Sequence, residues 1–110
     1  MCGPMTDAII VLVTAPTTDK AAELARLLVE EELAACGNVV PGLRSIYRWE
    51  GKVHDEPEAL LLLKTRASLF EALRERVVAV HPYQCPEVLR LDVTGGHAPY
   101  LEWILGNVRR

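Results

Sequence analysis

Apolar runs alternate along the chain with amphipathic segments, in an order that predicts a mixed α and β fold. Residues 8–13 (A-I-I-V-L-V) are apolar at every position and rich in β-branched side chains, as is typical of a strand covered on both faces. Residues 19–36 carry an apolar stripe at helical spacing, after Thr17 and Thr18, which can cap a helix. Gly37 follows this stripe, so we expect the helix to end at Cys36.

A β-hairpin is predicted next. Residues 39–50 are rich in β-forming side chains, and residues 58–65 form a second run that is apolar on both faces. Between them, Glu50-Gly51-Lys52 is a turn signal. Pro41 has no N–H for a sheet ladder, which places the first strand at an edge. Alternation along this strand puts four residues on one face: Leu43, Ser45, Tyr47 and Trp49.

The second half of the chain repeats the alternation of helix and strand. Ser68 and Glu71 form a capping box that opens a helix ending before Pro82. A half-exposed strand over residues 87–94 and an amphipathic helix over residues 99–108 follow. The order β-α-β-β-α-β with a further helix predicts a ferredoxin-like α+β sandwich, with the first and third strands central.

The predicted fold leaves one face of the sheet without a helix layer. Half of the apolar side chains of residues 9–13 and 59–63 would then meet water, although the last helix covers part of this face in one alternative. Tyr47 and Trp49 on the hairpin are residue types enriched at interface cores. We therefore expect an oligomer that buries the open face.

Length and charge narrow the class of protein. The 110 residues fit one domain, which we place at residues 8–110 behind a flexible leader of residues 1–7. The formal charge of −3 offers no electrostatic footprint for nucleic acid or an anionic membrane. The apolar run of residues 8–13 is too short to span a bilayer and lacks the flanks of a signal peptide. Three cysteines, with Cys2 in the leader, fit a reduced cytoplasmic protein with free thiols.

His81 and Cys85 are the leading candidates for metal ligation. They flank residues 82–84 and can approach one ion if the loop folds back, giving mixed nitrogen and sulfur ligands suited to copper or zinc. In the alternative, His81 ends a helix and Cys85 packs under the last strand. Cys36 is expected to be a small buried apolar residue, and His97 the exposed start of the last helix.

The hairpin carries a weaker second candidate for a metal site. Its side chains are an imidazole and three carboxylates: His54, Asp55, Glu56 and Glu58. A solvated hairpin would have the same composition. No nucleophile lies in a catalytic motif and no glycine-rich phosphate loop is present, so we expect no enzyme activity.

Five sequence blocks resemble the CutA family, the divalent-cation tolerance proteins. They are A-A-C-G-N at 34–38, P-G-L-R-S-I-Y-R-W-E-G-K at 41–52, L-K-T at 63–65, H-P-Y-Q-C-P-E at 81–87 and Y-L-E-W-I at 100–104. The resemblance covers residues 8–108 without gaps. It implies a ferredoxin-like fold in a tight homotrimer whose hairpins pair across subunits.

The resemblance also implies tolerance of copper and other divalent cations, and Cu(II) as a ligand. In family members with assigned ligands, these are a cysteine on the first strand and a His-His pair before Pro-Tyr. Here Val13 occupies the first position and Val80-His81 the pair, so only His81 matches. The family's copper site is therefore reduced in this chain, unless Cys85 or a neighbouring subunit supplies ligands.

The implied trimer is similar to that of the PII signalling proteins, which bind small molecules between subunits. The corresponding pocket residues here would be Tyr47, Trp49, Lys64, Tyr83 and Glu87. Lysine beside apolar walls suits an anionic ligand. The same residues can instead satisfy one another at a trimer interface. The expected function is a non-catalytic homotrimer that binds divalent cations, copper first; the alternatives are a PII-like sensor and a structural scaffold.

Overall fold

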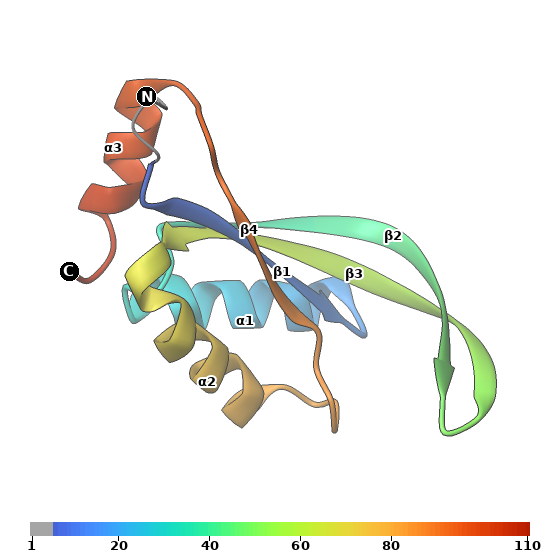
Figure 1. Cartoon of the computed structure of the whole chain (residues 1–110). Helices are drawn as coiled ribbons and strands as arrows, with labels where there is room; N and C mark the ends of the chain where they lie inside the picture. The colour runs from blue at the N-terminus through green and yellow to red at the C-terminus, as the bar shows by residue number, and fades with distance from the viewer. Residues whose placement is uncertain (1–5) are drawn as a thin grey trace.

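The computed structural model describes residues 6–110, so Cys2 and most of the expected leader lie outside the described part. Four strands and three α-helices follow one another in the predicted order (Figure 1). The elements are β1 (Ala8–Ala15), α1 (Thr18–Glu30), β2 (Cys36–Trp49), β3 (Lys52–Arg66), η1 (Ala67–Leu69), α2 (Phe70–Val80), β4 (Val88–Asp92) and α3 (Ala98–Gly106).

The strands form one antiparallel sheet in the order β2-β3-β1-β4, which confirms the α+β fold and the expected central and edge strands. Because β1 lies in the centre, it hydrogen bonds to β3 on one side and to β4 on the other. Leu12, for example, stands opposite Leu62 and Leu89. This register sets which side chains of the four strands share a face.

The core lies between the sheet and helices α1 and α2, which cover the same face (Figure 1). From β1 the buried side chains Ile9, Val11 and Val13 point into this layer. They meet Leu28 of α1 and Leu73 of α2, both without exposed surface. Full burial of one such side chain stabilises the fold by about 1.5–3 kcal/mol.

The opposite face of the sheet has no helix layer over its centre. Its apolar side chains, called the open face below, are Ile10, Leu12, Leu60, Leu62, Leu89 and Leu91. Leu89 and Leu91 are 55% and 51% exposed. Helix α3 packs beside the N-terminal end of β1 through Ile104 against Ala8, so it leaves these leucines uncovered. The single chain therefore has the sheet face that was predicted to lack a covering helix layer.

The first helix is shorter than predicted. It ends at Glu30, and β2 already begins at Cys36. The N–H groups of Leu33 and Ala34 both bond to the carbonyl of Leu28, so a tight turn replaces the last helical turns. Burial of these two apolar side chains in the core favours that turn over continued helix.

The predicted capping box at Ser68 is also wrong. Ser68 lies in η1, and α2 begins at Phe70 with no side-chain hydrogen bond to its N-terminus. The short 3₁₀ turn places Leu69 beneath α3, in a second buried apolar cluster that also contains Ala8, Ala35, Ile104 and Val108. The end of α2 at Val80 and the exposed start of α3 at His97 agree with the prediction.

Strands β2 and β3 extend beyond the body of the molecule as a bent arm (Figure 1). The radius of gyration of 14.8 Å exceeds the value of about 13 Å expected for a compact chain of this length. A shift of register between Val40 and Leu43, with Gly42 at a φ of 80°, marks the bend. In residues 6–110 the helices are all too short or too polar to cross a bilayer.

Candidate functional site

A cavity of about 670 Å³ lies where the hairpin arm meets the loop that connects α2 to β4. Strand β2 contributes Tyr47 and Trp49, and the loop contributes Tyr83 and Glu87. The full lining is Thr14, Ser45, Ile46, Tyr47, Trp49, Glu58, Pro82, Tyr83, Gln84, Cys85 and Glu87. Four of the five residues predicted to line a pocket between subunits therefore surround a cavity within one chain, and whether a second subunit completes it stays a prediction.

The register of the sheet explains how strand residues reach this cavity. Glu58 of β3 pairs with Leu43, which puts it on the same face as Tyr47. Thr14 of β1 stands opposite Leu60 of the open face. The cavity is therefore a continuation of the open face toward the arm.

A short hydrogen bond joins the loop to the sheet across the cavity. The Tyr83 hydroxyl donates to Glu58 Oε2 at 2.6 Å. Partial burial, this bond and the charge of Glu58 raise the pKa of Tyr83 above its usual range. Burial, together with the charge of Glu58, also raises the pKa of Glu87. Both shifts have the same two causes, partial desolvation of the group and the negative charge of Glu58 beside it.

His81 supports the loop from behind. Its ring is buried, its Nε2 lies 2.8 Å from the carbonyl oxygen of Thr14, and its Nδ1 accepts the N–H of Tyr83 at 3.0 Å. Because Nδ1 accepts, the hydrogen of the neutral ring is on Nε2, which donates to Thr14. Both ring nitrogens thus hold backbone groups, and His81 positions Tyr83 over the cavity.

The residues predicted to hold a metal do not form a preformed site in one chain. Both nitrogens of His81 are already hydrogen bonded, so neither presents a free lone pair. Cys85 is exposed and reduced at the rim of the cavity. Within residues 6–110, no group of three or more His, Cys, Asp or Glu side chains is placed to hold a metal ion.

The structure divides the acidic residues of the hairpin between two faces. Asp55 accepts two hydrogen bonds from Arg44, at 2.8 and 2.7 Å, on one face. His54 stacks on Tyr47 on the other face, with ring centroids 5.1 Å apart, and lies 4.0 Å from Glu56. These residues therefore do not converge on one ion.

Lys64 lies away from the cavity. It is six residues beyond Glu58 on β3, about 20 Å along the strand, and donates to the side chain of Asn38. Cys36 stands opposite Lys64, and its Sγ lies 3.8 Å from the Tyr100 hydroxyl. Cys36 is half-buried at the start of β2, not a buried residue at a helix end as predicted.

Two features of the site had no clear signal in the sequence. Glu58 and Tyr83 are 25 residues apart, and their bond follows from a strand register that the sequence leaves open. The hydrogen bond between His81 and the carbonyl of Thr14 joins residues 67 positions apart. Because the partner is a backbone atom, no side-chain type in the sequence indicates this bond. In the sequence, Glu58 was identified only as one of several acidic residues on the hairpin.

The strand order, the two helices on one face and the added α3 define a ferredoxin-like α+β protein. The family model for the CutA1 divalent ion tolerance protein matches residues 9–107, and the chain belongs to this family. The resemblance found in the sequence is thereby confirmed.

Relatives named CutA occur in bacteria and plants. The divalent-cation tolerance protein CutA of Thermus thermophilus is 50% identical over 98 residues, covering 89% of this chain and 95% of the relative. A chloroplastic CutA protein of Arabidopsis thaliana is 50% identical over 102 residues, or 93% of this chain. This chain spans only 56% of the Arabidopsis protein's length.

Solved structures of the family agree with the fold. The CutA1 structure from Thermus thermophilus superimposes with a TM-score of 0.90 at 48% identity, over 93% of this chain and 99% of that one. The rice CutA1 structure gives a TM-score of 0.91 at 47% identity, over 96% of each chain.

Proposed function

We propose that the protein is a non-catalytic homotrimer that binds divalent cations, copper(II) first, and contributes to their tolerance. Membership of the CutA1 family supports the cation class. The proposal depends most on Cys85, an exposed and reduced thiol at the rim of a cavity that also contains the Glu58 and Glu87 carboxylates. Thiolate is a ligand that zinc and copper(I) favour, and thiolate together with imidazole nitrogen also suits copper(II).

Because residues 6–110 of one chain hold no preformed metal site, the remaining ligands would come from a neighbouring subunit or from a rearranged loop. The open face supports the trimer, since it leaves Leu89 and Leu91 without a cover in the single chain. The cavity adjoins that face, so trimer formation would bring a second chain toward Cys85. His81 can join as a ligand only by giving up one of its two backbone hydrogen bonds.

Calorimetric titration tests the metal proposal. Cu(II), and Zn(II) as a redox-inert comparison, would be titrated into the trimer of a Cys2→Ser background, in which the leader thiol cannot bind. We expect stoichiometric binding that weakens about tenfold or more in Cys85→Ser, while the matched Cys36→Ser variant keeps it. Equal affinity in both variants, or no heat with an intact trimer, would contradict the proposal.

His81 is tested separately. We expect His81→Ala to weaken Cu(II) binding if the imidazole is a ligand in the trimer. Unchanged affinity would remove His81 from the metal site and leave it the structural role of holding Tyr83.

We propose the cytoplasm as the location, because Cys36 and Cys85 are both free thiols. Reducing conditions preserve such thiols. Labelling of the thiols in intact cells and after lysis tests this: equal modification in both samples by an impermeant reagent would contradict it.

The second candidate function is a PII-like sensor that binds a small molecule in the cavity. It is favoured by a specific observation: the cavity joins Tyr47, Trp49, Tyr83 and Glu87, as expected for a binding pocket. A thermal-shift screen of small metabolites against the trimer tests it, and the absence of any stabilising ligand would count against it.

A further inference from the structure

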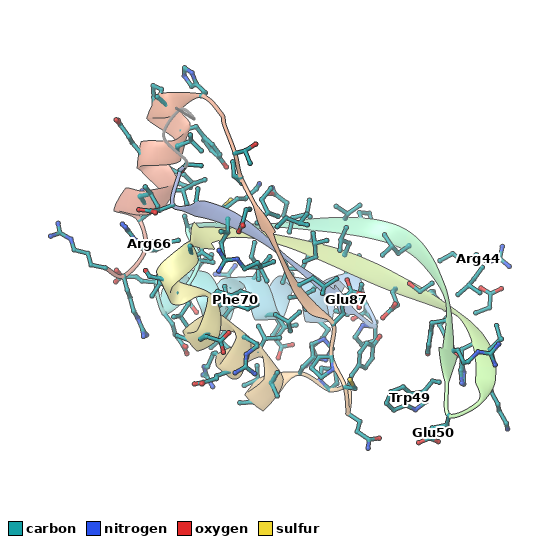
Figure 2. The ribbon with its side chains drawn as sticks, in the orientation of Figure 1. Arg44, Trp49, Glu50, Arg66, Phe70 and Glu87 are labelled. Atoms are coloured by element: carbon teal, nitrogen blue, oxygen red, sulfur yellow. The ribbon has the colours of Figure 1, made fainter. Side chains whose placement is uncertain are left out.

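Three aromatic side chains line the cavity between the arm and the loop. Tyr47 and Trp49 come from β2, and Tyr83 comes from the opposite wall. Tyr47 and Trp49 keep 42% and 40% of their surface exposed, so their rings are accessible to a ligand in the cavity. Figure 2 shows Trp49 extending from the arm toward the side on which β4 and the loop lie. Faces of aromatic rings carry partial negative charge and attract cations.

The charged groups of the cavity are all acidic. Glu58 and Glu87 line it, and none of its lining side chains among residues 6–110 is Lys, Arg or His. Nearby Glu56 adds to the negative charge, because its carboxylate is one of the groups that raise the pKa of Tyr83. An anion would enter against this field, whereas a cation would relieve the repulsion between Glu58 and Glu87.

We propose that this cavity binds a small organic ammonium ion, a protonated amine on a short alkyl chain. The inference rests on the second candidate function, that the cavity binds a small molecule, and it replaces the anionic ligand expected around Lys64. An ammonium group offers three N–H donors to the Glu58 and Glu87 carboxylates, and its alkyl chain packs on the rings of Tyr47 and Trp49.

The ligand class is tested with three compounds of equal chain length. They are 1,4-diaminobutane, 1,4-butanediol and succinate, which carry ammonium, hydroxyl and carboxylate ends on four-carbon chains. Binding is followed by tryptophan fluorescence in the Trp103→Phe variant, where Trp49 is the only tryptophan and itself lines the cavity. We expect a saturable change with the diamine only, weakening as salt is raised.

Variants locate the binding. Glu87→Gln removes one charge with little change of shape and is expected to weaken diamine binding about tenfold, while the matched variant Glu30→Gln, at an exposed position of α1, leaves it unchanged. Trp49→Leu removes a ring and is expected to weaken binding about fivefold by calorimetry. Its control is Trp103→Leu, a similarly exposed tryptophan outside the cavity. Sedimentation of each variant shows whether the assembly is intact.

The outcomes separate this inference from the proposals above. Binding of succinate instead of the diamine would overturn the ligand class and leave the sensor function standing. Binding of none of the three to an intact assembly would overturn the ammonium inference, and the thermal-shift screen would then decide the sensor function. Copper titration of Cys85→Ser gives a separate readout, because the ammonium inference does not use Cys85, although both proposals share the Glu58 and Glu87 carboxylates of the cavity. Diamine binding unaffected by Glu87→Gln and Trp49→Leu would place the ligand elsewhere and overturn the site.

Discussion

At Gly37 the absence of a side chain sets how closely β2 approaches α1. A Cβ at this position would lie 2.8 Å from the Cβ of Ala25, and 3.1 and 3.2 Å from methyl groups of Leu63 and Leu61. All three neighbours belong to the densely packed core, Ala25 from α1 and the two leucines from β3. The glycine is therefore required by packing, not by the helix end that the sequence suggested.

We expect Gly37→Ala to destabilise the fold by about 1–3 kcal/mol, because the extra methyl group overpacks the core. Urea unfolding at a fixed protein concentration measures the change. Gly95→Ala is the matched control, since nothing lies within 4 Å of a Cβ there. A loss in the control equal to that at Gly37 would contradict the packing explanation, because Gly→Ala by itself restricts the unfolded chain and favours folding.

Glu87 links the proposed binding site to stability. Its pKa is raised above the usual 4.5 by burial and by the charge of Glu58, so the ionised carboxylate opposes folding. We expect Glu87→Gln to be more stable than the wild type at about pH 7. The difference should vanish as the pH falls below the usual carboxyl pKa, where the wild-type side chain is protonated in both states.

Thermal unfolding of the wild type and of Glu87→Gln between about pH 7 and pH 3.5 checks this dependence. A stability gain that stays constant over this range would point to packing of the amide. Combined with weaker diamine binding, a pH-dependent gain identifies Glu87 as a residue whose charge serves binding at the expense of stability.

Among the elements, the turn between β2 and β3 contains a residue that does not suit its backbone geometry. Trp49 and Lys52 are paired, and the two residues between them, Glu50 and Gly51, have φ angles of 50° and 79°. Two-residue turns with both φ values positive favour Asn-Gly, because asparagine tolerates the left-handed region better than glutamate.

We therefore expect Glu50→Asn to stabilise the protein by about 0.5 kcal/mol without affecting the cavity, which Glu50 does not line. The measurement is a shift of the urea midpoint at constant slope. Gly51→Ala serves as the opposite control, since an alanine at a φ of 79° is strained. A stabilising alanine would show that the turn relaxes and that its φ values are not enforced.

Elements were predictable from the sequence where periodicity decided them. The apolar runs of residues 8–13 and 58–65 identified β1 and β3 as central strands because both of their faces need cover. The end of α1 was not predictable in this way. Leu33 and Ala34 continue an apolar pattern and are buried, but they are buried in a turn whose geometry depends on contacts with β3.

The candidate site was predictable in part for a related reason. Tyr47 and Trp49 share a face by simple alternation, and the block of residues 81–87 marked Tyr83 and Glu87. Lys64 was grouped with them because it lies in the L-K-T block of the family resemblance. The predicted strand over residues 58–65 already separates it from Glu58 by six residues, about 20 Å, and the structure shows that this separation keeps it out of the cavity.

At the scale of the whole molecule, the proposed trimer predicts that a charged side chain placed on the open face will prevent assembly. Leu91 of β4 is 51% exposed in the single chain, and a charge there would be buried unpaired in the assembly. We expect Leu91→Glu to sediment as a monomer of 12.2 kDa and the wild type at three times that mass. Val78→Glu on α2, which starts from a similar exposure of 47%, should remain a trimer.

Circular dichroism keeps this test decisive by showing whether the Leu91→Glu chain is still folded. A folded variant that remains trimeric would exclude the open face as the subunit interface. Wild-type protein that sediments as a monomer would remove the assembly from the proposed function altogether.

The central position of β1 also governs how the chain is made. This strand is synthesised first, yet its partners in the sheet are residues 52–66 and 88–92. At a translation rate of 5–20 residues per second, β1 waits roughly 4–15 seconds before β4 has been synthesised. Helix α1 is the first element made after β1 that packs in the same apolar core, and β3 and α2 follow before β4. Because one edge of β1 still lacks β4 throughout that time, β1 is a segment that needs protection on the ribosome.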